Sequence, residues 1–304
     1  MSGLDVVVAG SHGLIGSALV DHLAHRGHRV RRLVRRRPET SREIGWDPQR
    51  GRLDVAALRS ADVVVNVGGA GIGDHRWTPE YRATVLRSRT VPTGLLARTL
   101  ANLDDGPRVL LQGSAVGYYG DRGEEVLTEA SAPGTGFLAD VVRAWEGATA
   151  PAEDAGVRVA HLRTGIVMSH RGGSFGRLLP LLRLGVGGPL GDGSAVWSWI
   201  TLVDQVRAIE HLCTADVRGP VNLTAPAPAR AGEIVAAVAR ALHRPALVRV
   251  PRLALRAVLG EFADEGVLAS QRALPTVLAG SGFEHTHASL DAAAAWLAGA
   301  PPRA

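Results

Sequence analysis

The chain contains no lysine, because all 34 of its basic residues are arginines. This absence excludes a Schiff-base lysine, the lysine of a phosphate-binding loop and a lysine that tunes a neighbouring tyrosine. A strongly GC-rich genome produces the same bias, so the absence need not reflect selection. Any catalysis by this chain must nevertheless rely on other side chains.

Cysteine and aromatic residues are also scarce. Cys213 is the only cysteine, which excludes an intramolecular disulfide and a cysteine-based zinc site and favours a reducing cytoplasm. With 46% hydrophobic but only 4% aromatic residues, alanine, valine and leucine must fill a globular core. No apolar run approaches about 18 residues and no basic-then-apolar leader is visible, so we expect no membrane span and no signal peptide.

Strands and helices alternate through the first half of the chain. Short β-branched runs predict strands at 5–9, 29–34, 61–67, 108–114 and 157–163. Periodic segments between them predict helices at 13–28, 78–100 and 136–156, the second with Thr78 as N-cap and Pro79 in the first turn. This alternation predicts an α/β fold with a doubly wound parallel sheet of the Rossmann type.

The rhythm changes after Gly165. Residues 176–193 are rich in glycine and proline, 197–212 read as a strand entering a helix, 219–228 as a strand and loop, and the remainder as mostly helical. We expect a nucleotide-binding domain at 1–165, to which 197–214 returns. Residues 166–196 and 215–304 would then form a smaller, mostly helical substrate lobe, with the ligand in the cleft between the two.

A glycine triplet marks the first strand–helix junction. Gly10, Gly13 and Gly16 are spaced by two residues each in "AGSHGLIGSALV". Such spacing allows a tight turn and a close approach of backbone to a pyrophosphate, while the helix N-terminus offers free N–H groups and a positive dipole. The spacing predicts dinucleotide binding; the alternative is a structural turn of an unrelated α/β fold.

The second predicted strand ends in arginines instead of the acidic residue that binds ribose hydroxyls in many dinucleotide folds. In "LVRRRPE", Arg35 follows the strand directly and Arg36 comes next. A guanidinium attracts a 2′-phosphate, which a carboxylate would repel, so the run favours NADP(H) over NAD(H). Binding of a 2′-phosphate would also explain the densest basic run of the chain, so that no nucleic-acid partner is needed. The simpler alternative is that these arginines form a solvated basic loop.

Several sequence blocks resemble one family. They include "GSHGLIG", "GDHRWTPEYRATVLRSR" at 73–89 and "GSAVGYYGDRGEEVLTE" at 113–129. With them, nearly the whole chain resembles the atypical, epimerase-like branch of the extended short-chain dehydrogenases/reductases, within the NAD-dependent epimerase/dehydratase superfamily. This resemblance implies a Rossmann fold and cofactor contacts along the glycine loop, the second strand and three later strand ends. The predicted cofactor-binding residues are Gly10, Ser11, His12, Gly13, Leu14, Ile15, Gly16, Arg35, Arg36, Gly68, Gly69, Ser114, Arg163 and Gly165.

The chain departs from ordinary members of that superfamily at the catalytic helix. They carry a Tyr-x-x-x-Lys pair there, in which the tyrosine exchanges a proton with the substrate and the lysine lowers its pKa. Phe137 and Val141 stand at the corresponding positions. The usual proton transfer is therefore unavailable, as the resemblance to the atypical branch implies.

Other residues could replace the missing pair. Tyr118 and Tyr119 follow the fifth predicted strand and Ser114 begins the same segment, at the sheet edge that faces the cofactor. We predict Ser114, Tyr118 and Tyr119 as catalytic candidates; the alternative is that the tyrosines cap the core and the serine is an ordinary loop residue. Arg76 and Trp77 precede the long helix, where they could clamp an anionic substrate group. The alternative is that Trp77 packs against its surroundings while Arg76 is solvated.

Three histidines, His22, His25 and His28, are spaced by three around a helix end. They could bind a metal, but histidines near a helix C-terminus more often interact with the helix dipole, so we predict no metal site.

The sequence thus favours an NADP(H)-dependent oxidoreductase or epimerase-like enzyme acting on a small polar substrate. The alternative is a non-catalytic NADP(H)-binding or sensing protein. We expect no nucleic-acid or membrane partner. A homodimer through the helices after the fourth and fifth strands is possible by analogy with related folds.

Overall fold

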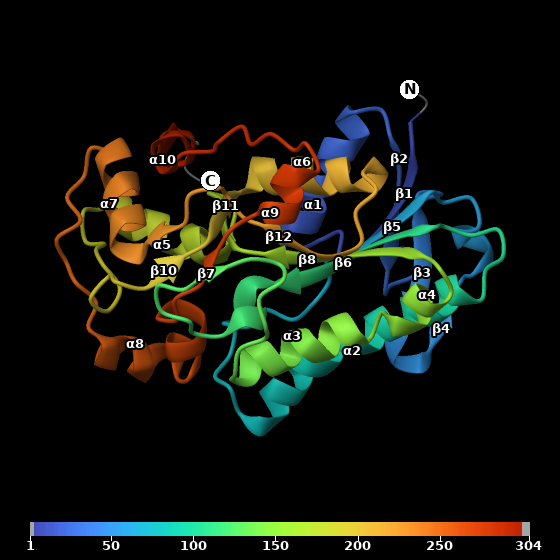
Figure 1. The fold of residues 1–304 in the computed structure, drawn as a ribbon, viewed down its shortest axis with the longest axis horizontal. Coiled ribbons are helices and arrows are strands. Elements are labelled where there is room, and N and C mark those ends of the chain that lie inside the picture. Colours follow the sequence, from blue (N-terminus) through green and yellow to red (C-terminus); the bar gives the residue numbers. More distant parts are fainter. Residues whose placement is uncertain (1–2, 300–304) are drawn as a thin grey trace.

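The computed structural model describes residues 3–299, in which one large sheet runs through the molecule (Figure 1). Its strands lie in the order β12-β8-β6-β5-β1-β2-β3-β4, and all neighbours are parallel except β3 and β4. The bounds in that order are Gly219–Leu223, Arg158–Thr164, Val109–Ala115, Val63–Asn66, Asp5–Ala9, Arg29–Val34, Glu43–Asp47 and Arg52–Leu53. The expected Rossmann-type sheet is confirmed.

Helices cover both faces of this sheet. On one face lie α1 (Leu14–His25) and α6 (Leu202–Thr214); on the other lie α2 (Pro79–Ala101), α3 (Phe137–Gly147) and α4 (Ala150–Asp154) (Figure 1). The alternation of β1 explains the two layers, since Val6 and Val8 pack with α1 and α6 while Val7 and Ala9 pack with α2. Each face of the sheet therefore has its own apolar core.

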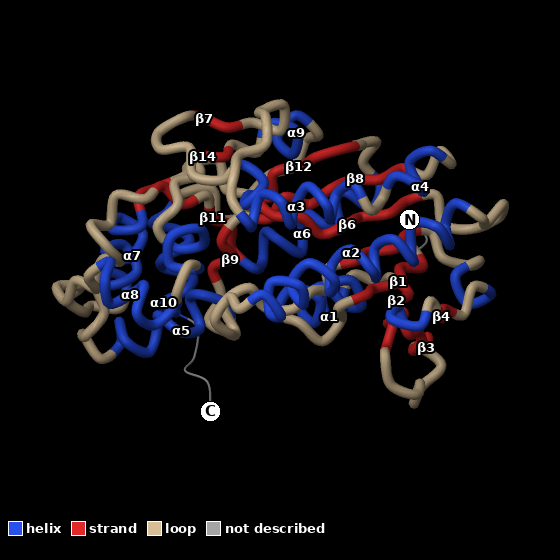
Figure 2. The backbone as a smooth tube through the Cα atoms, turned by 90° about the horizontal axis from the view of Figure 1, so that it is seen from below, coloured by secondary structure: helices blue, strands red, loops and turns tan. Residues whose placement is uncertain are grey.

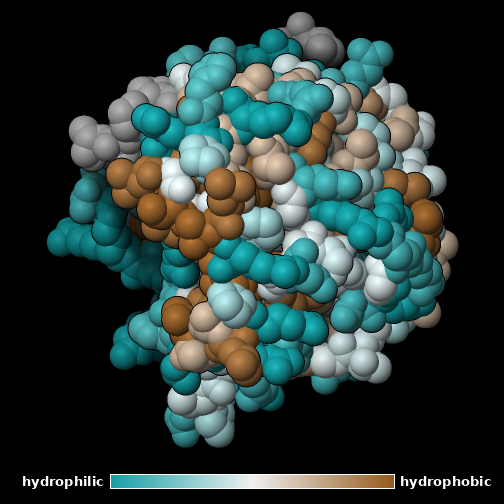
Figure 3. All heavy atoms as spheres, turned by 90° about the vertical axis from the view of Figure 1, so that its left-hand side faces the viewer, coloured by the Kyte–Doolittle hydropathy of each residue, from teal (hydrophilic) through white to brown (hydrophobic). Residues whose placement is uncertain are grey.

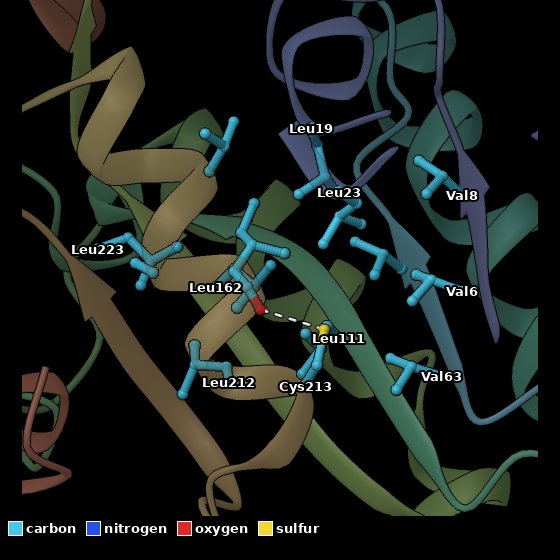
Figure 4. Close-up of a cluster of buried hydrophobic side chains, with 14 of the residues drawn as sticks. Val6, Val8, Leu19, Leu23, Val63, Leu111, Leu162, Leu212, Cys213 and Leu223 are labelled. Atoms are coloured by element: carbon cyan, nitrogen blue, oxygen red, sulfur yellow. Dashed lines mark hydrogen bonds between the residues drawn. The ribbon is translucent and has the colours of Figure 1, made fainter. Parts of the chain in front are cut away.

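The core under α1 and α6 consists mainly of aliphatic side chains, which converge between helix and sheet in Figure 4. Leu19 and Leu23 of α1 meet Leu111 and Leu162 of the central strands, all fully buried. Cys213 lies at the end of this cluster and donates its S–H to the carbonyl of Ile209 at 3.3 Å. Burial raises the pKa of its thiol to about 12, so Cys213 behaves as a small apolar residue.

The smaller lobe is mostly helical. It contains α5 (Gly173–Arg183), α7 (Ala231–Ala241), α8 (Arg252–Leu259) and α10 (Leu290–Gly299), which lie to the left of the large sheet in Figure 2, opposite β3 and β4. Short strand pairs and α9 (Thr276–Gly280) connect this lobe to the sheet. The pairs are β9–β11 (Ile166–Met168, Trp199–Thr201), β10–β13 (Val196–Trp197, Ala229–Arg230) and β7–β14 (Val126–Leu127, Arg272–Ala273).

The outer end of the smaller lobe exposes apolar side chains. Figure 3 views this end and shows hydrophobic groups gathered among hydrophilic ones. The exposed large apolar residues of α5, α8 and the loops beside them are Leu181, Leu184, Val186, Leu247, Val248, Leu253 and Val258. Within residues 3–299 these side chains remain between 47% and 84% exposed.

The structure corrects the expected elements in four places. The helix expected at 136–156 is two helices, α3 and α4, because Pro151 lacks the N–H that would continue the helix beyond Gly147. The glycine- and proline-rich segment 176–193 is partly helical, because its first residues belong to α5. Burial of Leu179 and Leu182 there outweighs the low helix propensity of glycine and proline. Strands β3 and β4, which the sequence analysis did not predict, extend the sheet beyond β2.

The fourth correction concerns the lobe boundary. Strand β12, which falls within the expected substrate lobe of 215–304, pairs in parallel with β8 from Gly219 to Leu223. Val221 and Leu223 are fully buried in the same core as α1 and α6. The sheet thus takes in residues 219–223, and the smaller lobe resumes only after Leu223.

Candidate functional site

A cavity of about 780 Å³ opens where β1, β2 and β5 end at their carboxyl edge. This is the edge at which open α/β sheets bind ligands. Six of the predicted cofactor-binding residues line it: Gly10, His12, Gly13, Arg35, Gly68 and Gly69. Trp46, Pro48 and Gln49, which the sequence analysis did not single out, join them from the segment around β3.

The glycine triplet forms a tight turn between β1 and α1. Gly10 has a φ of +78°, and a Cβ there would lie only 2.6 Å from the amide nitrogen of Gly68. A Cβ on Gly16 would collide with the carbonyl oxygen of Gly10, which itself accepts a 3.0 Å bond from the Gly13 N–H. Glycine is therefore required for steric reasons, and this backbone forms a cradle at the N-terminus of α1.

The remaining residues of the loop shape the cradle. Ser11 is buried, with its Oγ 3.4 Å from Nδ1 of His12, whereas His12 itself is exposed beside the cavity. Leu14 and Ile15 are half-buried and pack against the core under α1. Gly13 is the N-cap of α1 and has no side chain to satisfy the first N–H groups, which stay available to an anion.

Arg35 and Arg36 have different environments. Arg36 binds Glu43 with both terminal nitrogens, at 2.6 and 3.0 Å, and also lies 3.1 Å from Glu39. Arg35 is exposed, lines the main cavity and, with Trp46, also lines a neighbouring cavity of about 510 Å³. Within residues 3–299 Arg35 has no carboxylate partner. Of the two arginines, Arg35 is thus the one free to bind an added phosphate.

The structure brings Ser114 and Arg163 together through Glu146 of α3. Ser114 Oγ donates to Glu146 Oε1 at 2.6 Å, and Arg163 Nε and Nη2 bind the two carboxylate oxygens, each at 2.9 Å. Burial alone would raise the pKa of Glu146, but the bonds and charge of Arg163 outweigh it, so the pKa lies below its ordinary value. Glu146 is a charged, well-satisfied member of this network that the sequence analysis missed.

Tyr119 belongs to the same network and is fully buried. Its hydroxyl accepts a 3.1 Å bond from Arg163 Nη1 and donates to Oδ1 of Asn222 at 2.8 Å. Burial, the largest effect, raises the pKa of Tyr119 despite these contacts. This arrangement agrees with the alternative interpretation, in which the tyrosine caps the core.

Tyr118 packs edge-to-face against Tyr119 and also contacts Arg163. Its half-buried ring has the Arg163 guanidinium carbon 3.5 Å from its centroid, a close cation–π contact. No hydrogen bond of its hydroxyl is found in residues 3–299. Of the two adjacent tyrosines, Tyr118 is thus the one whose hydroxyl is free.

Gly165 and the residues before α2 have packing roles. A Cβ on Gly165 would lie 2.5 Å from the carbonyl oxygen of Ser198, so this glycine lets β8 pass close to β11. Trp77 is buried against Phe137, with 4.9 Å between ring centroids, and Arg76 reaches out to the carbonyl of Ala257 on α8. These contacts favour the packing interpretation of Arg76 and Trp77 over a substrate clamp.

Two of the three histidines near the end of α1 contact the same carboxylate. His22 Nε2 and His28 Nε2 lie 2.7 and 3.2 Å from Glu210 of α6, while His25 Nδ1 lies 2.6 Å from the carbonyl of Asp21. His22 and His28 thus link the end of α1 to α6 on the face of the sheet opposite α2, whereas the contact of His25 stays within α1.

Two family models and several curated proteins match this chain. The model of the NAD dependent epimerase/dehydratase family matches residues 6–224, and a domain of unknown function, DUF1731, matches 250–297. The chain is 44% identical over 288 residues to the epimerase family protein Mb2239 of Mycobacterium bovis, covering 94% of this chain and 95% of that protein. It is 35% identical over 292 residues to a chloroplastic SDR39U1 homologue of Arabidopsis thaliana, covering 93% and 83%.

Among solved structures, the human epimerase family protein SDR39U1 with NADPH superposes with a TM-score of 0.89 at 30% identity. The match covers 97% of this chain and 99% of the human one. MoeE5 in complex with UDP-glucose and NAD matches with a TM-score of 0.76, 96% and 97% coverage and 22% identity, a likeness of fold alone.

Proposed function

The chain belongs to the NAD dependent epimerase/dehydratase family, and on this premise we propose that it is an NADP(H)-dependent oxidoreductase or epimerase-like enzyme. Its substrate would be a small polar molecule. One observation carries the proposal: the cavity at the sheet edge extends from the glycine cradle to the unpaired guanidinium of Arg35.

The residues around the cavity fit a dinucleotide with a 2′-phosphate. Gly10 and Gly16 leave space where any side chain would collide with backbone, and the uncapped first turn of α1 offers N–H groups to a pyrophosphate. Arg35 would bind the 2′-phosphate, while Gly68 and Gly69 would let the adenosine side lie close to the backbone. The human relative with NADPH supports this choice of cofactor.

The nicotinamide group would supply hydride chemistry to a substrate in the interlobe cleft. This chain's own contribution would be the proton. Tyr118 is the best candidate to hold it, since its hydroxyl is free while that of Tyr119 is bonded to Asn222. Arg163 and Glu146 would position Tyr118 through the cation–π contact without touching the substrate themselves.

A titration with NADPH and NADH, run on the natural chain and on Arg35→Ala, tests the cofactor assignment. We expect the variant to lose about 10- to 100-fold in NADPH affinity, as charge-assisted hydrogen bonds are worth about 1.5–3 kcal/mol. NADH affinity should change little. Arg36→Ala is the matched control, since its guanidinium is bonded to Glu43. If neither nucleotide binds to the natural chain, the proposal fails.

A non-catalytic NADP(H)-sensing role is the second candidate, because the hydrogen bonds of Ser114 and Tyr119 are already made within the protein. Oxidation of stoichiometric NADPH against a panel of carbonyl compounds and nucleotide sugars separates the two. Turnover that Tyr118→Phe abolishes while NADPH still binds would support the enzyme. NADPH-dependent binding of another protein, with no turnover, would support the sensor.

The proposal also includes the cellular location and the oligomeric state of the protein. We place it in the cytoplasm on the evidence of its single, buried thiol. None of the helices described in residues 3–299 is long and apolar enough to cross a bilayer. A homodimer through α2 and α3 would follow the analogy with related folds, and the molar mass in solution tests it.

A further inference from the structure

We propose that the outer end of the smaller lobe docks on an anionic phospholipid surface, with apolar side chains among the acyl chains and arginines at the headgroup phosphates. The surface concerned, here called the outer apolar face, consists of the seven exposed leucines and valines of α5, α8 and the loops beside them (Figure 3). The proposal does not depend on the proposed function. The expectation of no membrane partner rested on the absence of a run long enough to span a bilayer, and a face that lies on a bilayer needs no such run.

The end of α5 and the loop that leads into α8 lie side by side on this face. A Cβ on Gly185 would lie 3.5 Å from the side chain of Pro245. Leu184, next to that glycine, is 76% exposed, and Leu247, two residues after that proline, is 84% exposed. The exposed side chains therefore come from neighbouring segments, and apolar groups gathered in this way on a surface mark a site of interaction.

Helix α8 carries apolar side chains on its inner and its outer side. Leu255 is buried against the lobe, whereas Leu253 and Val258 remain 77% and 72% exposed. The outer side of a surface helix is usually polar, since only the stripe that faces the core needs to be apolar. Packing of α8 within the lobe thus explains Leu255 but explains neither Leu253 nor Val258.

The segments that form this face carry arginines and no acidic residue. Neither 177–191 nor 240–260 contains an aspartate or a glutamate, although arginines recur through both. Arg244 and Arg252 are exposed and form no ion pair within residues 3–299, whereas Arg256 is paired with Asp264 just after α8. Guanidinium groups beside exposed leucines complement a layer of phosphates above a layer of acyl chains.

Charge distinguishes an anionic membrane from a second copy of this chain as the partner of the face. A two-fold dimer through the outer apolar face would bring the arginines of both copies together, where like charges repel. An anionic bilayer instead matches the guanidinium groups with phosphates and the leucines with acyl chains at the same time. The cytoplasmic leaflet of a membrane carries such a negative charge.

Sedimentation with lipid vesicles tests the proposal. The natural chain should bind vesicles of phosphatidylcholine and phosphatidylglycerol in equal parts, and added salt should weaken this binding because it screens the attraction between arginine and phosphate. Vesicles of phosphatidylcholine alone should bind the chain about tenfold more weakly. The partition coefficient, obtained from the fraction bound at increasing lipid concentration, measures both effects.

Variants of both kinds of side chain separate insertion from charge attraction. The double variant Leu184→Ser with Leu253→Ser should lower the partition coefficient on anionic vesicles about tenfold or more, because two apolar groups are lost. Arg252→Gln should lower it about fivefold. Val126→Ser on β7 and Arg98→Gln on α2 are the matched controls, since both residues are exposed but lie outside the face. They should leave the coefficient nearly unchanged.

Failure of the natural chain to bind the anionic vesicles would overturn the proposal, and dimers in solution that the leucine variant does not form would then assign the face to a second copy. Equal binding by the natural chain and the leucine variant would also overturn it, because arginines alone would then hold the vesicle. Thermal denaturation checks that the variants fold. If the leucine variant does not fold, Arg252→Gln carries the test, and binding equal to that of Arg98→Gln would overturn the proposal.

Discussion

The two ends of the site differ in how completely their polar groups are satisfied. At the β2 end, Arg35 is exposed and has no acid partner in residues 3–299, and the glycine cradle leaves N–H groups uncapped. At the β6 end, Ser114, Glu146 and Arg163 bind one another at 2.6 to 2.9 Å. One end is thus open to a ligand, while the other is a closed network that holds its own geometry.

This difference separates binding from chemistry. Groups left free before a ligand arrives add their hydrogen bonds to its affinity, whereas groups already paired contribute mainly rigidity. The β2 end should therefore determine which nucleotide binds, and the β6 end should determine whether the site keeps the shape that a reaction needs.

Breaking the closed network should have the largest effect. Arg163→Met leaves the carboxylate of Glu146 buried without its cation, which typically costs about 3–5 kcal/mol of folding stability. Urea denaturation measures the loss. Arg122→Met is the matched control, because Arg122 holds Glu125 in the same two-pronged way on an exposed loop, where about 0–1 kcal/mol is expected. Equal losses of stability in the two variants would show that the buried network stabilises the fold no more than an exposed ion pair does.

Filling the cradle comes next. Gly16→Ala places a methyl group against the carbonyl of Gly10, and the resulting backbone shift should cost about 1–3 kcal/mol in stability and also weaken nucleotide binding. Denaturation and NADPH titration together measure it. Gly147→Ala at the end of α3 is the control, because a Cβ there would meet no atom within 4 Å. NADPH affinity and stability both unchanged in Gly16→Ala would contradict the cradle.

Smaller effects are expected at the two neighbouring tyrosines, where one substitution should lower stability and the other should lower turnover. Tyr119→Phe leaves Asn222 Oδ1 without its donor inside the core, so about 1–2 kcal/mol of stability should be lost. Tyr118→Phe should cost little stability but should remove any turnover. Thermal denaturation and an NADPH oxidation assay, run on both variants, check the pair. A larger stability loss in Tyr118→Phe would reverse the assignment of the two hydroxyls.

The smallest expected effect is on the pH dependence of stability, which compares the natural chain with Glu146→Gln in acid. The pKa of Glu146 is below its ordinary value in the folded state, so its contribution to stability is present above the unfolded pKa and is lost as pH falls through the folded one. The unfolding free energy of the natural chain should thus fall more steeply below about pH 4.5 than that of Glu146→Gln. Parallel slopes in urea titrations would contradict the lowered pKa.

The sequence predicted best the features that depend on local backbone. The family and the Rossmann-type sheet were confirmed. The glycine spacing predicted a turn that allows no side chain at Gly10 or Gly16, and the arginine run predicted a residue, Arg35, that lines the cavity. Both predictions depend only on where a strand ends. Their roles toward a cofactor stay predictions.

The closed network could not be predicted in the same way. Ser114, Glu146, Arg163 and Asn222 come from β6, α3, β8 and β12, and only the sheet order places them together. Glu146 gave no signal, since a glutamate on an amphipathic helix is usually solvated. Nor does sequence distinguish Tyr118 from Tyr119, which one short turn, Val116–Tyr119, orients in different directions.

The buried thiol of Cys213 has a practical consequence for chemical labelling. The chain offers no lysine amine, and its only thiol lies on the buried face of α6 with a pKa of about 12. Maleimides and amine-reactive esters should therefore leave its side chains largely unmodified. A single cysteine introduced on an exposed position, such as that of Ala83 beside the cavity, would be a unique attachment point for a fluorophore. Its emission could then report nucleotide binding directly, without any other residue being replaced.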